Sequence, residues 1–345
     1  MPPGSTIPVL DSVTHTSLEG MSWRRSLAGA IRSTSELLQR LELSHDTSPL
    51  QAERDFPVLV PQSYLARMRP RDPQDPLLLQ VLPRPEEGVA VPGFQHDPVG
   101  DLTARQVPGL LQKYQGRTLL ITTGACAIHC RYCFRRHYPY SDDPHGLAQW
   151  EPALQAIRSD ASIREVLLSG GDPLVLPDEQ LSRLIDEIEG IPHVERLRIH
   201  SRLPIVLPDR INAELICRLT QSPLTVVVVV HANHARELVG DCADALDRLR
   251  QAGLTVLNQT VLLKGVNDSV EALAELSERC IELGVVPYYL HQLDRVSGAA
   301  HFEVPVEQGQ QLIQSLRERL PGYLVPRYVT EVAGEFSKRP LMPGE

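Results

Sequence analysis

The stretch RTLLITTGACAIHCRYC, residues 117–133, contains two patterns in immediate succession. Its first seven residues are rich in leucine, isoleucine and threonine, a composition that predicts a buried strand. Cys126, Cys130 and Cys133 then lie within eight residues of one another, whereas the other three cysteines of the chain are scattered. A polar loop directly after a strand is the place where parallel α/β folds hold their ligands. The stretch therefore predicts an α/β fold with a site at this loop.

The same succession of strand and helix repeats along the chain. Runs of aliphatic and β-branched residues alternate with amphipathic stretches, two of which end at the helix-terminating glycines Gly253 and Gly284. We expect six strands, at 117–123, 164–169, 195–200, 224–230, 254–263 and 285–290. Alternating strands and helices imply parallel pairing through right-handed crossovers. Six units are too few for a full eight-stranded barrel, which leaves a partial barrel or an open doubly wound sheet.

Chemically distinctive residues lie at the ends of the predicted strands or within them. After the cysteine loop come SGGDP (169–173), HSRLP (200–204), HANH (231–234) and HQLD (291–294), and the fifth strand itself carries Asn258 and Gln259. Because the carboxyl ends of parallel strands meet at one edge of a sheet, a single site at one mouth of the fold is the simplest account.

The residues before the predicted strands follow a different pattern. STSELLQRLELS (33–44) predicts a capped helix, but the prolines of residues 69–98 exclude one regular element there. We expect three parts: a helical and irregular region over 1–100, the main barrel over 101–320, and a C-terminal segment over 321–345.

The composition excludes several classes of protein. The chain has 345 residues, 42% of them hydrophobic, which is enough for one large domain or two ordinary ones. A formal charge of −9 argues against non-specific nucleic-acid binding. No apolar run reaches the roughly 18 residues of a membrane span, and the N-terminus lacks the pattern of a secretory signal. We expect a cytoplasmic protein that binds neither nucleic acid nor membranes.

The cysteine loop predicts a metal site with an open position. A structural zinc usually takes four ligands, and His129 is poorly placed as the fourth because it adjoins Cys130. An iron–sulfur cubane normally takes four cysteines, so three would leave one iron free to bind another molecule. The alternative is a zinc knuckle in a binding module without catalysis.

The sequence CAIHCRYC (126–133) resembles the signature of radical S-adenosylmethionine (SAM) enzymes, and SGGDP resembles their second motif. Within that superfamily, VPGLLQKYQGRTLLIT (107–122) and the tail YLVPRYVTEVAGEFSKRPLMPGE (323–345) resemble the lysine 2,3-aminomutase family. The resemblance runs from about residue 70 to 340. It implies a partial (β/α)6 TIM-like barrel of the radical SAM type, with a helical N-terminal extension and a C-terminal tail that binds pyridoxal 5′-phosphate (PLP).

The resemblance also implies roles for individual residues. A [4Fe-4S] cluster would be held by Cys126, Cys130 and Cys133. SAM would contact Gly170, Gly171, Asp172, His231 and Gln259. PLP would be bound covalently by Lys338, with Lys113 and Arg117 near its phosphate. The substrate carboxylate would meet Arg135, and the substrate ε-ammonium would meet Asp294 and Glu331, where the family has two aspartates.

Each of these residues also has a simpler interpretation. Arg135 and Arg136 could be a solvent-facing basic pair, Lys338 a solvated lysine of the tail, and each acid a surface residue. Two acids opposite an arginine would select lysine and repel glutamate, because lysine is cationic at one end and anionic at the other.

Several further segments look most similar to the branch of the family that serves elongation factor P. They are CRYCFRRHYPY (130–140), RIHSRLPIV (198–206), LNQTVLLKGVND (257–268), PYYLHQLDRVSGAAHF (287–302) and GEFSK (334–338). We also expect no cysteine-bearing C-terminal extension of the kind found in catabolic members.

The branch implies isomerisation of (S)-α-lysine to (R)-β-lysine, which a partner ligase attaches to elongation factor P. It also implies free L-lysine as substrate and an electron donor such as flavodoxin or ferredoxin. The alternatives are a free-standing lysine 2,3-aminomutase for another β-lysine pathway and a non-catalytic zinc-stabilised module.

Overall fold

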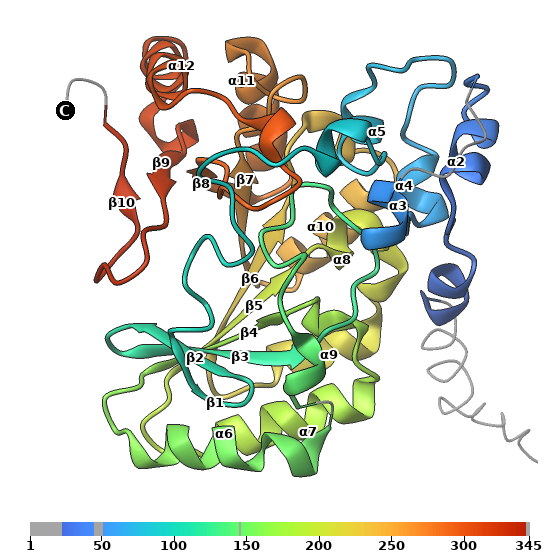
Figure 1. Cartoon of the computed structure of the whole chain (residues 1–345). Helices are drawn as coiled ribbons and strands as arrows, with labels where there is room; N and C mark the ends of the chain where they lie inside the picture. Colours follow the sequence, from blue (N-terminus) through green and yellow to red (C-terminus); the bar gives the residue numbers. More distant parts are fainter. Residues whose placement is uncertain (1–22, 45–50, 145, 343–345) are drawn as a thin grey trace, which may run out of the picture.

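The computed structural model describes residues 23–44, 51–144 and 146–342. Residues 1–22 and 45–50 of the predicted N-terminal region, and 343–345 of the predicted C-terminal segment, lie outside the described residues. The described strands form one sheet in which ten strands are ordered as they follow one another in the chain, from β1 to β10 (Figure 1).

The six predicted strands are all present and all parallel. They are β3 (Arg117–Thr123), β4 (Glu165–Gly170), β5 (Arg196–Ser201), β6 (Thr225–His231), β7 (Thr255–Val261) and β8 (Val285–His291). Their ends differ from the predicted ends by at most two residues. The agreement arises because buried parallel strands consist of short runs of β-branched and aliphatic residues, such as the five consecutive valines of β6.

Four further strands flank this parallel group. β1 (Arg105–Val107) and β2 (Leu110–Tyr114) extend it in antiparallel fashion before β3, and β9 (Arg327–Thr330) lies parallel to β8. β10 (Arg339–Pro340) pairs antiparallel with β9. Since β1 and β10 stand at opposite ends of the strand order, the sheet is open.

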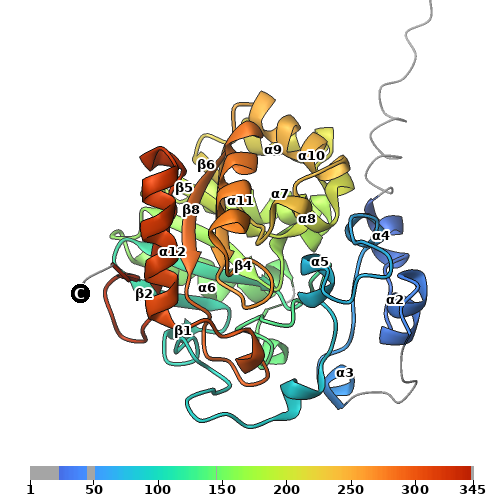
Figure 2. The same ribbon diagram turned by 90° about the horizontal axis from the view of Figure 1, so that it is seen from above.

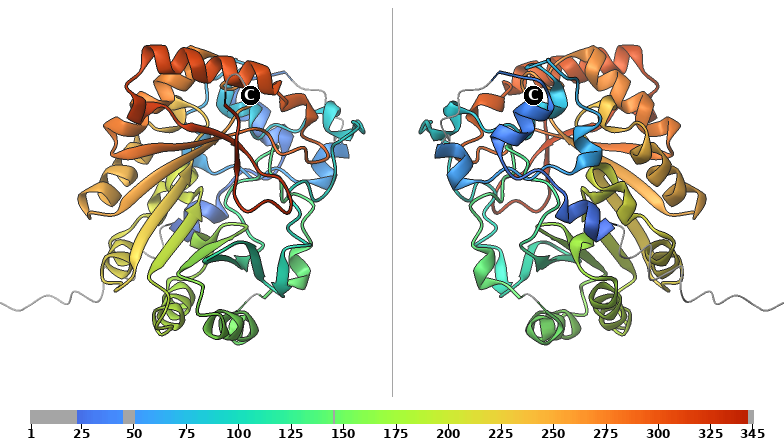
Figure 3. Two further views of the ribbon diagram at one scale, coloured as in Figure 1. Left: turned by 90° about the vertical axis from the view of Figure 1, so that its left-hand side faces the viewer. Right: turned by 90° about the vertical axis from the view of Figure 1, so that its right-hand side faces the viewer.

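The curvature of the sheet decides between the two predicted architectures. Figure 3 shows the helices on the convex side of the sheet, whereas the loop between β9 and β10 lies on the concave side. A doubly wound sheet would carry helices on both faces. The fold is therefore a partial barrel (Figure 3), in agreement with the architecture that the resemblance implies.

The helices on the convex side pack through amphipathic faces. They are α6 (Leu147–Ser159), α7 (Asp178–Glu189), α9 (Ala213–Thr220), α10 (Asp241–Gln251), α11 (Val270–Glu282) and α12 (Val306–Arg319) (Figure 2). In α7 the buried residues Leu181, Leu184, Ile185 and Ile188 recur at the three- and four-residue spacing of one helical face. The predicted glycines after α10 and α11 adopt positive φ angles of 76° and 72°, which suits a helix terminus.

The N-terminal residues form short helices against the mouth of the barrel. They are α2 (Thr34–Arg40), α3 (Gln51–Asp55), α4 (Gln62–Leu65) and α5 (Pro76–Leu79), and one further short helix, α8 (Leu203–Val206), follows β5. Ser33 caps α2 through the backbone N–H of Glu36, as the sequence predicts. Trp23 and Leu37 belong to the same hydrophobic core as Leu120 of β3. The predicted three-part division of the chain stays a prediction.

None of the helices in the described ranges is both long enough and apolar enough to cross a lipid bilayer.

Candidate active site

A cavity of about 530 Å³ lies on the concave side of the sheet, within the range of about 300–1,000 Å³ usual for small-molecule sites. All fourteen predicted site residues line it: Lys113, Arg117, Cys126, Cys130, Cys133, Arg135, Gly170, Gly171, Asp172, His231, Gln259, Asp294, Glu331 and Lys338. The cavity also extends along the inner face of the sheet, because Leu119 of β3 and Arg198 of β5 contribute to its wall. The single predicted site is therefore deeper than a ring of loops at the mouth.

The three clustered cysteines lie on the loop after β3 and carry no disulfide. Burial raises the pKa of the Cys133 thiol to about 11, and the neighbouring Cys130 adds to the effect. Thiolates crowded in this way need a cation, and a metal cluster supplies it. Among the described residues, no three His, Cys, Asp or Glu side chains are gathered tightly enough to hold one metal ion.

His129 points away from the cavity, as its place next to Cys130 predicts. Its Nδ1 lies 2.7 Å from the carbonyl oxygen of Pro57, and its ring stacks on Phe56 with 4.9 Å between centroids. The N-terminal region therefore fixes the outer side of the cysteine loop.

Gly170 and Gly171 are required by the protein's own backbone. Gly170 has φ of +120°, and a Cβ there would lie 2.6 Å from the carbonyl oxygen of Thr123. A Cβ on Gly171 would overlap the carbonyl group of Ala125. The resemblance implies that SAM contacts both glycines, but the close contacts that exclude a Cβ here come from the chain itself. The predicted contact with SAM stays a prediction.

Asp172 and His231 are both engaged within the protein. The Asp172 carboxylate accepts hydrogen bonds from the Ser201 hydroxyl and the Arg202 backbone N–H, each at 2.7 Å. Burial raises the pKa of Asp172 to about 6. Nε2 of His231 lies 3.0 Å from the Tyr132 hydroxyl, and burial lowers the pKa of His231 to about 3, so this imidazole is neutral.

A row of alternating charges crosses the cavity wall. Nε of Arg135 donates to Asp101 at 2.6 Å, and Asp101 also pairs with Nζ of Lys113 at 2.6 Å. Lys113 reaches Glu331 at 2.8 Å, and Glu331 pairs in turn with Lys338. Burial alone would raise the pKa of Asp101, but the Arg135 and Lys113 cations hold it below its usual value. The predicted cofactor lysines and one predicted substrate acid therefore form a single electrostatic unit.

Arg135 and Arg136 are not a solvent-facing pair. The Arg135 side chain is 8% exposed and the Arg136 side chain 3%. They diverge, since Arg136 donates to Glu87 at 2.8 Å while Arg135 faces the cavity.

Asp294 differs from the other acids of the cavity. No described residue donates a hydrogen bond to its carboxylate or pairs with it within ion-pair distance. Burial raises the pKa of Asp294 to about 7, although the nearby Lys338 acts in the opposite direction. A cation bound in the cavity would supply the compensation that the protein does not.

Arg117, at the start of β3, can bind a small anion in the cavity. Arg117 makes no ion pair with any described residue, and its guanidinium lies 4.5 Å from the ring centre of Tyr114. Two buried polar atoms on the cavity wall, Nε of Arg202 and Nε2 of His200, also have no partner among the described groups. An unpaired cation, unpaired donors and a lysine from the tail fit an anionic cofactor such as PLP together with a polar SAM molecule.

Sequence reasoning missed several of these residues. Asp101 lies in an irregular segment and carries no local signal, although it joins Arg135 to Lys113. Arg202 lies in the HSRLP segment, which gives it no individual role, but its guanidinium contacts Sγ of Cys130. Only contacts between distant segments identify either role.

Comparison with known proteins agrees with the site. Residues 120–277 match the Radical SAM superfamily. The chain is 44% identical to L-lysine 2,3-aminomutase of Escherichia coli (strain K12), an alignment that covers 92% of this chain and 94% of that protein. It is 42% identical to L-lysine 2,3-aminomutase of Haemophilus influenzae, over 93% of this chain and 95% of the relative. The corresponding protein of Clostridium subterminale is 36% identical, over 93% of this chain and 78% of its own length.

Proposed function

The chain belongs to the L-lysine 2,3-aminomutase family of radical SAM proteins, and on this premise we propose that it isomerises (S)-α-lysine to (R)-β-lysine. The observation that carries the proposal is the meeting of three cysteines, an unpaired carboxylate and a tail lysine in one cavity.

We propose a [4Fe-4S] cluster, SAM and PLP as cofactors, with the residue roles that the sequence resemblance implies. When bound, the cluster and SAM supply the radical that removes a hydrogen atom from the substrate, and PLP supplies the conjugated system through which nitrogen migrates. The protein orients these groups and keeps water out of a cavity built largely from buried side chains. Lys338 would hold PLP through its side-chain amine, which is paired with Glu331 in the cofactor-free chain.

The charges of the cavity support lysine as the substrate. Nη2 of Arg135 makes no hydrogen bond to a described residue and can receive a carboxylate. Asp294 has no ion-pair partner among the described residues and can receive the ε-ammonium. Oε1 of Glu331 accepts from Lys113, and its Oε2, which accepts from Lys338 here, would become available to the ammonium when Lys338 holds PLP. Two acids at this place disfavour glutamate, whose second carboxylate would lie against them.

We also propose that the protein takes part in the modification of elongation factor P. The support for this role is the likeness of the five segments quoted above to that branch of the family. In this role the β-lysine passes to a separate ligase, the electron comes from flavodoxin or ferredoxin, and the reaction takes place in the cytoplasm. The mass of elongation factor P isolated from cells that lack this gene tests the assignment. An unchanged modification would favour a free-standing aminomutase.

Anaerobic reconstitution tests the chemistry. Reduced protein incubated with labelled L-lysine, SAM and PLP should yield β-lysine, identified by chromatography and mass spectrometry. A Cys130→Ala variant should lose the iron–sulfur absorbance and the product. Cys217→Ala is the matched control, because Cys217 is an exposed cysteine outside the cavity. A colourless protein containing only zinc would support the binding-module alternative and end the proposal.

A further inference from the structure

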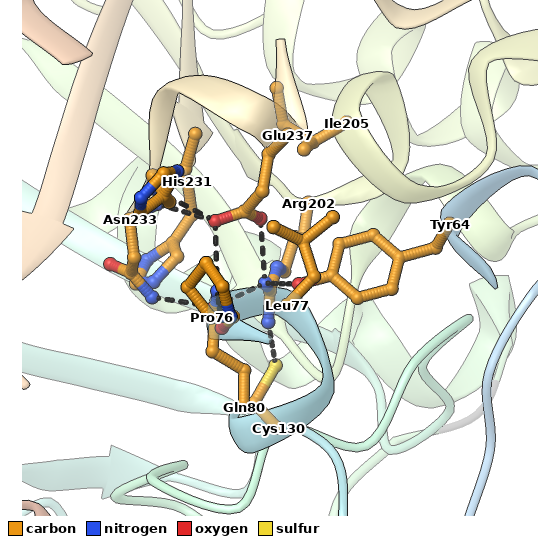
Figure 4. Close-up of polar contacts among 12 residues, drawn as sticks. Tyr64, Pro76, Leu77, Gln80, Cys130, Arg202, Ile205, His231, Asn233 and Glu237 are labelled. Atoms are coloured by element: carbon orange, nitrogen blue, oxygen red, sulfur yellow. Dashed lines mark hydrogen bonds and ion pairs between the residues drawn. The ribbon is translucent and has the colours of Figure 1, made fainter. Parts of the chain in front are cut away.

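Arg202 is the first residue after β5. Among the described residues, it is the only cationic side chain that donates a hydrogen bond to one of the clustered cysteines. Its backbone N–H is tied to Asp172 at 2.7 Å, and its guanidinium donates from Nη1 to Sγ of Cys130 (Figure 4). The side chain is 8% exposed, so solvent does little to screen its charge.

The opposite side of the guanidinium is held by residues from two distant parts of the chain. Nη2 lies 2.9 Å from Glu237 and 2.8 Å from the side-chain oxygen of Gln80, with the Tyr64 hydroxyl at 3.3 Å (Figure 4). Gln80 also donates to the other oxygen of Glu237 at 3.1 Å, which closes a ring of contacts. Tyr64 and Gln80 come from the N-terminal region, so this region fixes the direction in which Arg202 points.

This geometry bears on the ease of cluster reduction. A hydrogen bond and a positive charge at a ligating sulfur stabilise the reduced cluster, which carries one more negative charge than the oxidised cluster. Glu237 lies on the far side of the guanidinium and partly offsets that charge. The cation is nearer to the sulfur than the carboxylate is, so the cation should dominate.

We propose that Arg202 is a positioning residue that raises the reduction potential of the cluster through Cys130, and that Glu237, Gln80 and Tyr64 set the strength of this effect. The inference rests on the proposed function, since it requires the cluster. The step concerned is uptake of one electron by the cluster from an external reductant, without a change in any covalent bond of the protein.

A second buried arginine provides a matched control for a merely structural role. Arg210 is fully buried and paired with Asp178 at 2.7 Å, but it does not line the cavity. Its replacement removes a second buried arginine cation, but no hydrogen bond to the cysteine loop, because Arg210 contacts Asp178 and the carbonyl oxygen of Leu174.

The test is a redox titration of the reconstituted holoprotein without SAM, with the reduced cluster measured by electron paramagnetic resonance at fixed applied potentials. Arg202→Gln should lower the ratio of reduced to oxidised cluster about tenfold, which is about 59 mV for a one-electron couple. Glu237→Gln should raise that ratio, because it removes the opposing charge and keeps an acceptor for Arg202. Arg210→Gln should leave it unchanged.

Opposite shifts in the Arg202 and Glu237 variants would support the inference. If Arg202→Gln does not fold because Glu237 is left unpaired, the double variant removes both charges and should still lower the ratio. Equal potentials in all variants, or shifts of the same sign, would overturn the inference while the proposed function stands. Absence of a four-iron signal in the unaltered protein would instead overturn the proposed function.

Discussion

Replacement of Glu331 by glutamine should cost the cofactor-free chain a large, pH-dependent part of its stability. Glu331 is 14% exposed and pairs with both Lys113 and Lys338. Burial alone would raise its pKa, but the two ammonium groups lower it from 4.5 to about 2. Each pKa unit corresponds to about 1.36 kcal/mol, so the ionised carboxylate contributes about 3 kcal/mol at neutral pH.

The sign of the pH dependence follows from the lowered pKa. Stability from Glu331 is fully present above its unfolded pKa of 4.5 and disappears as the pH falls through the folded pKa of about 2. At pH 3 the linkage relation leaves less than half of this contribution. The difference in unfolding free energy between the unaltered chain and Glu331→Gln should therefore shrink by about 2 kcal/mol between pH 7 and pH 3.

Urea unfolding of both proteins at a series of pH values measures this difference. Glu335→Gln is the matched control, because Glu335 lies on the same loop but pairs with Arg339, whose side chain is 54% exposed. An exposed pair should contribute no more than about 1 kcal/mol. A difference for Glu331→Gln that stays constant from pH 7 to pH 3 would refute the ion-pair reasoning.

Three further predictions follow from the cavity. Because burial raises the pKa of Asp294 to about 7, the KM for lysine should rise as the pH falls below 7. The Asp294→Asn variant should lose this pH dependence and bind lysine more weakly. Loss of a charged hydrogen bond of about 1.5–3 kcal/mol predicts a KM roughly 10- to 100-fold higher at neutral pH. A KM profile unaffected by the substitution would contradict this role. Gly171→Ala should prevent stable assembly of the cysteine loop, measured as lost iron content, because its Cβ overlaps Ala125, whereas Gly190→Ala should keep full iron since its nearest contact is 3.5 Å away. Lys338→Ala should abolish β-lysine formation but keep the iron–sulfur spectrum, and a normal rate without added amine would exclude Lys338 as the PLP lysine.

The curvature of the sheet and the two strands before β3 could not be predicted from the sequence. Hydrophobic runs locate the six parallel strands, but they do not show whether the sheet curves into a partial barrel or carries helices on both faces. β1 and β2 are missed because they are short antiparallel strands, only one of which has buried residues. Such strands lack the continuous apolar runs that mark buried parallel strands.

The sequence by itself determines the local chemistry: the spacing of Cys126, Cys130 and Cys133 along one loop, and the strands whose ends bring polar residues to one side of the sheet. It does not determine which charges neutralise one another. Lys113 and Glu331 are separated by 218 residues, and Arg135 and Asp101 by 34. Electrostatic pairing depends on distance and burial in space, so only the tertiary structure decides that Glu331 pairs with two lysines, that no described residue pairs with Asp294, and that Arg202 faces Cys130.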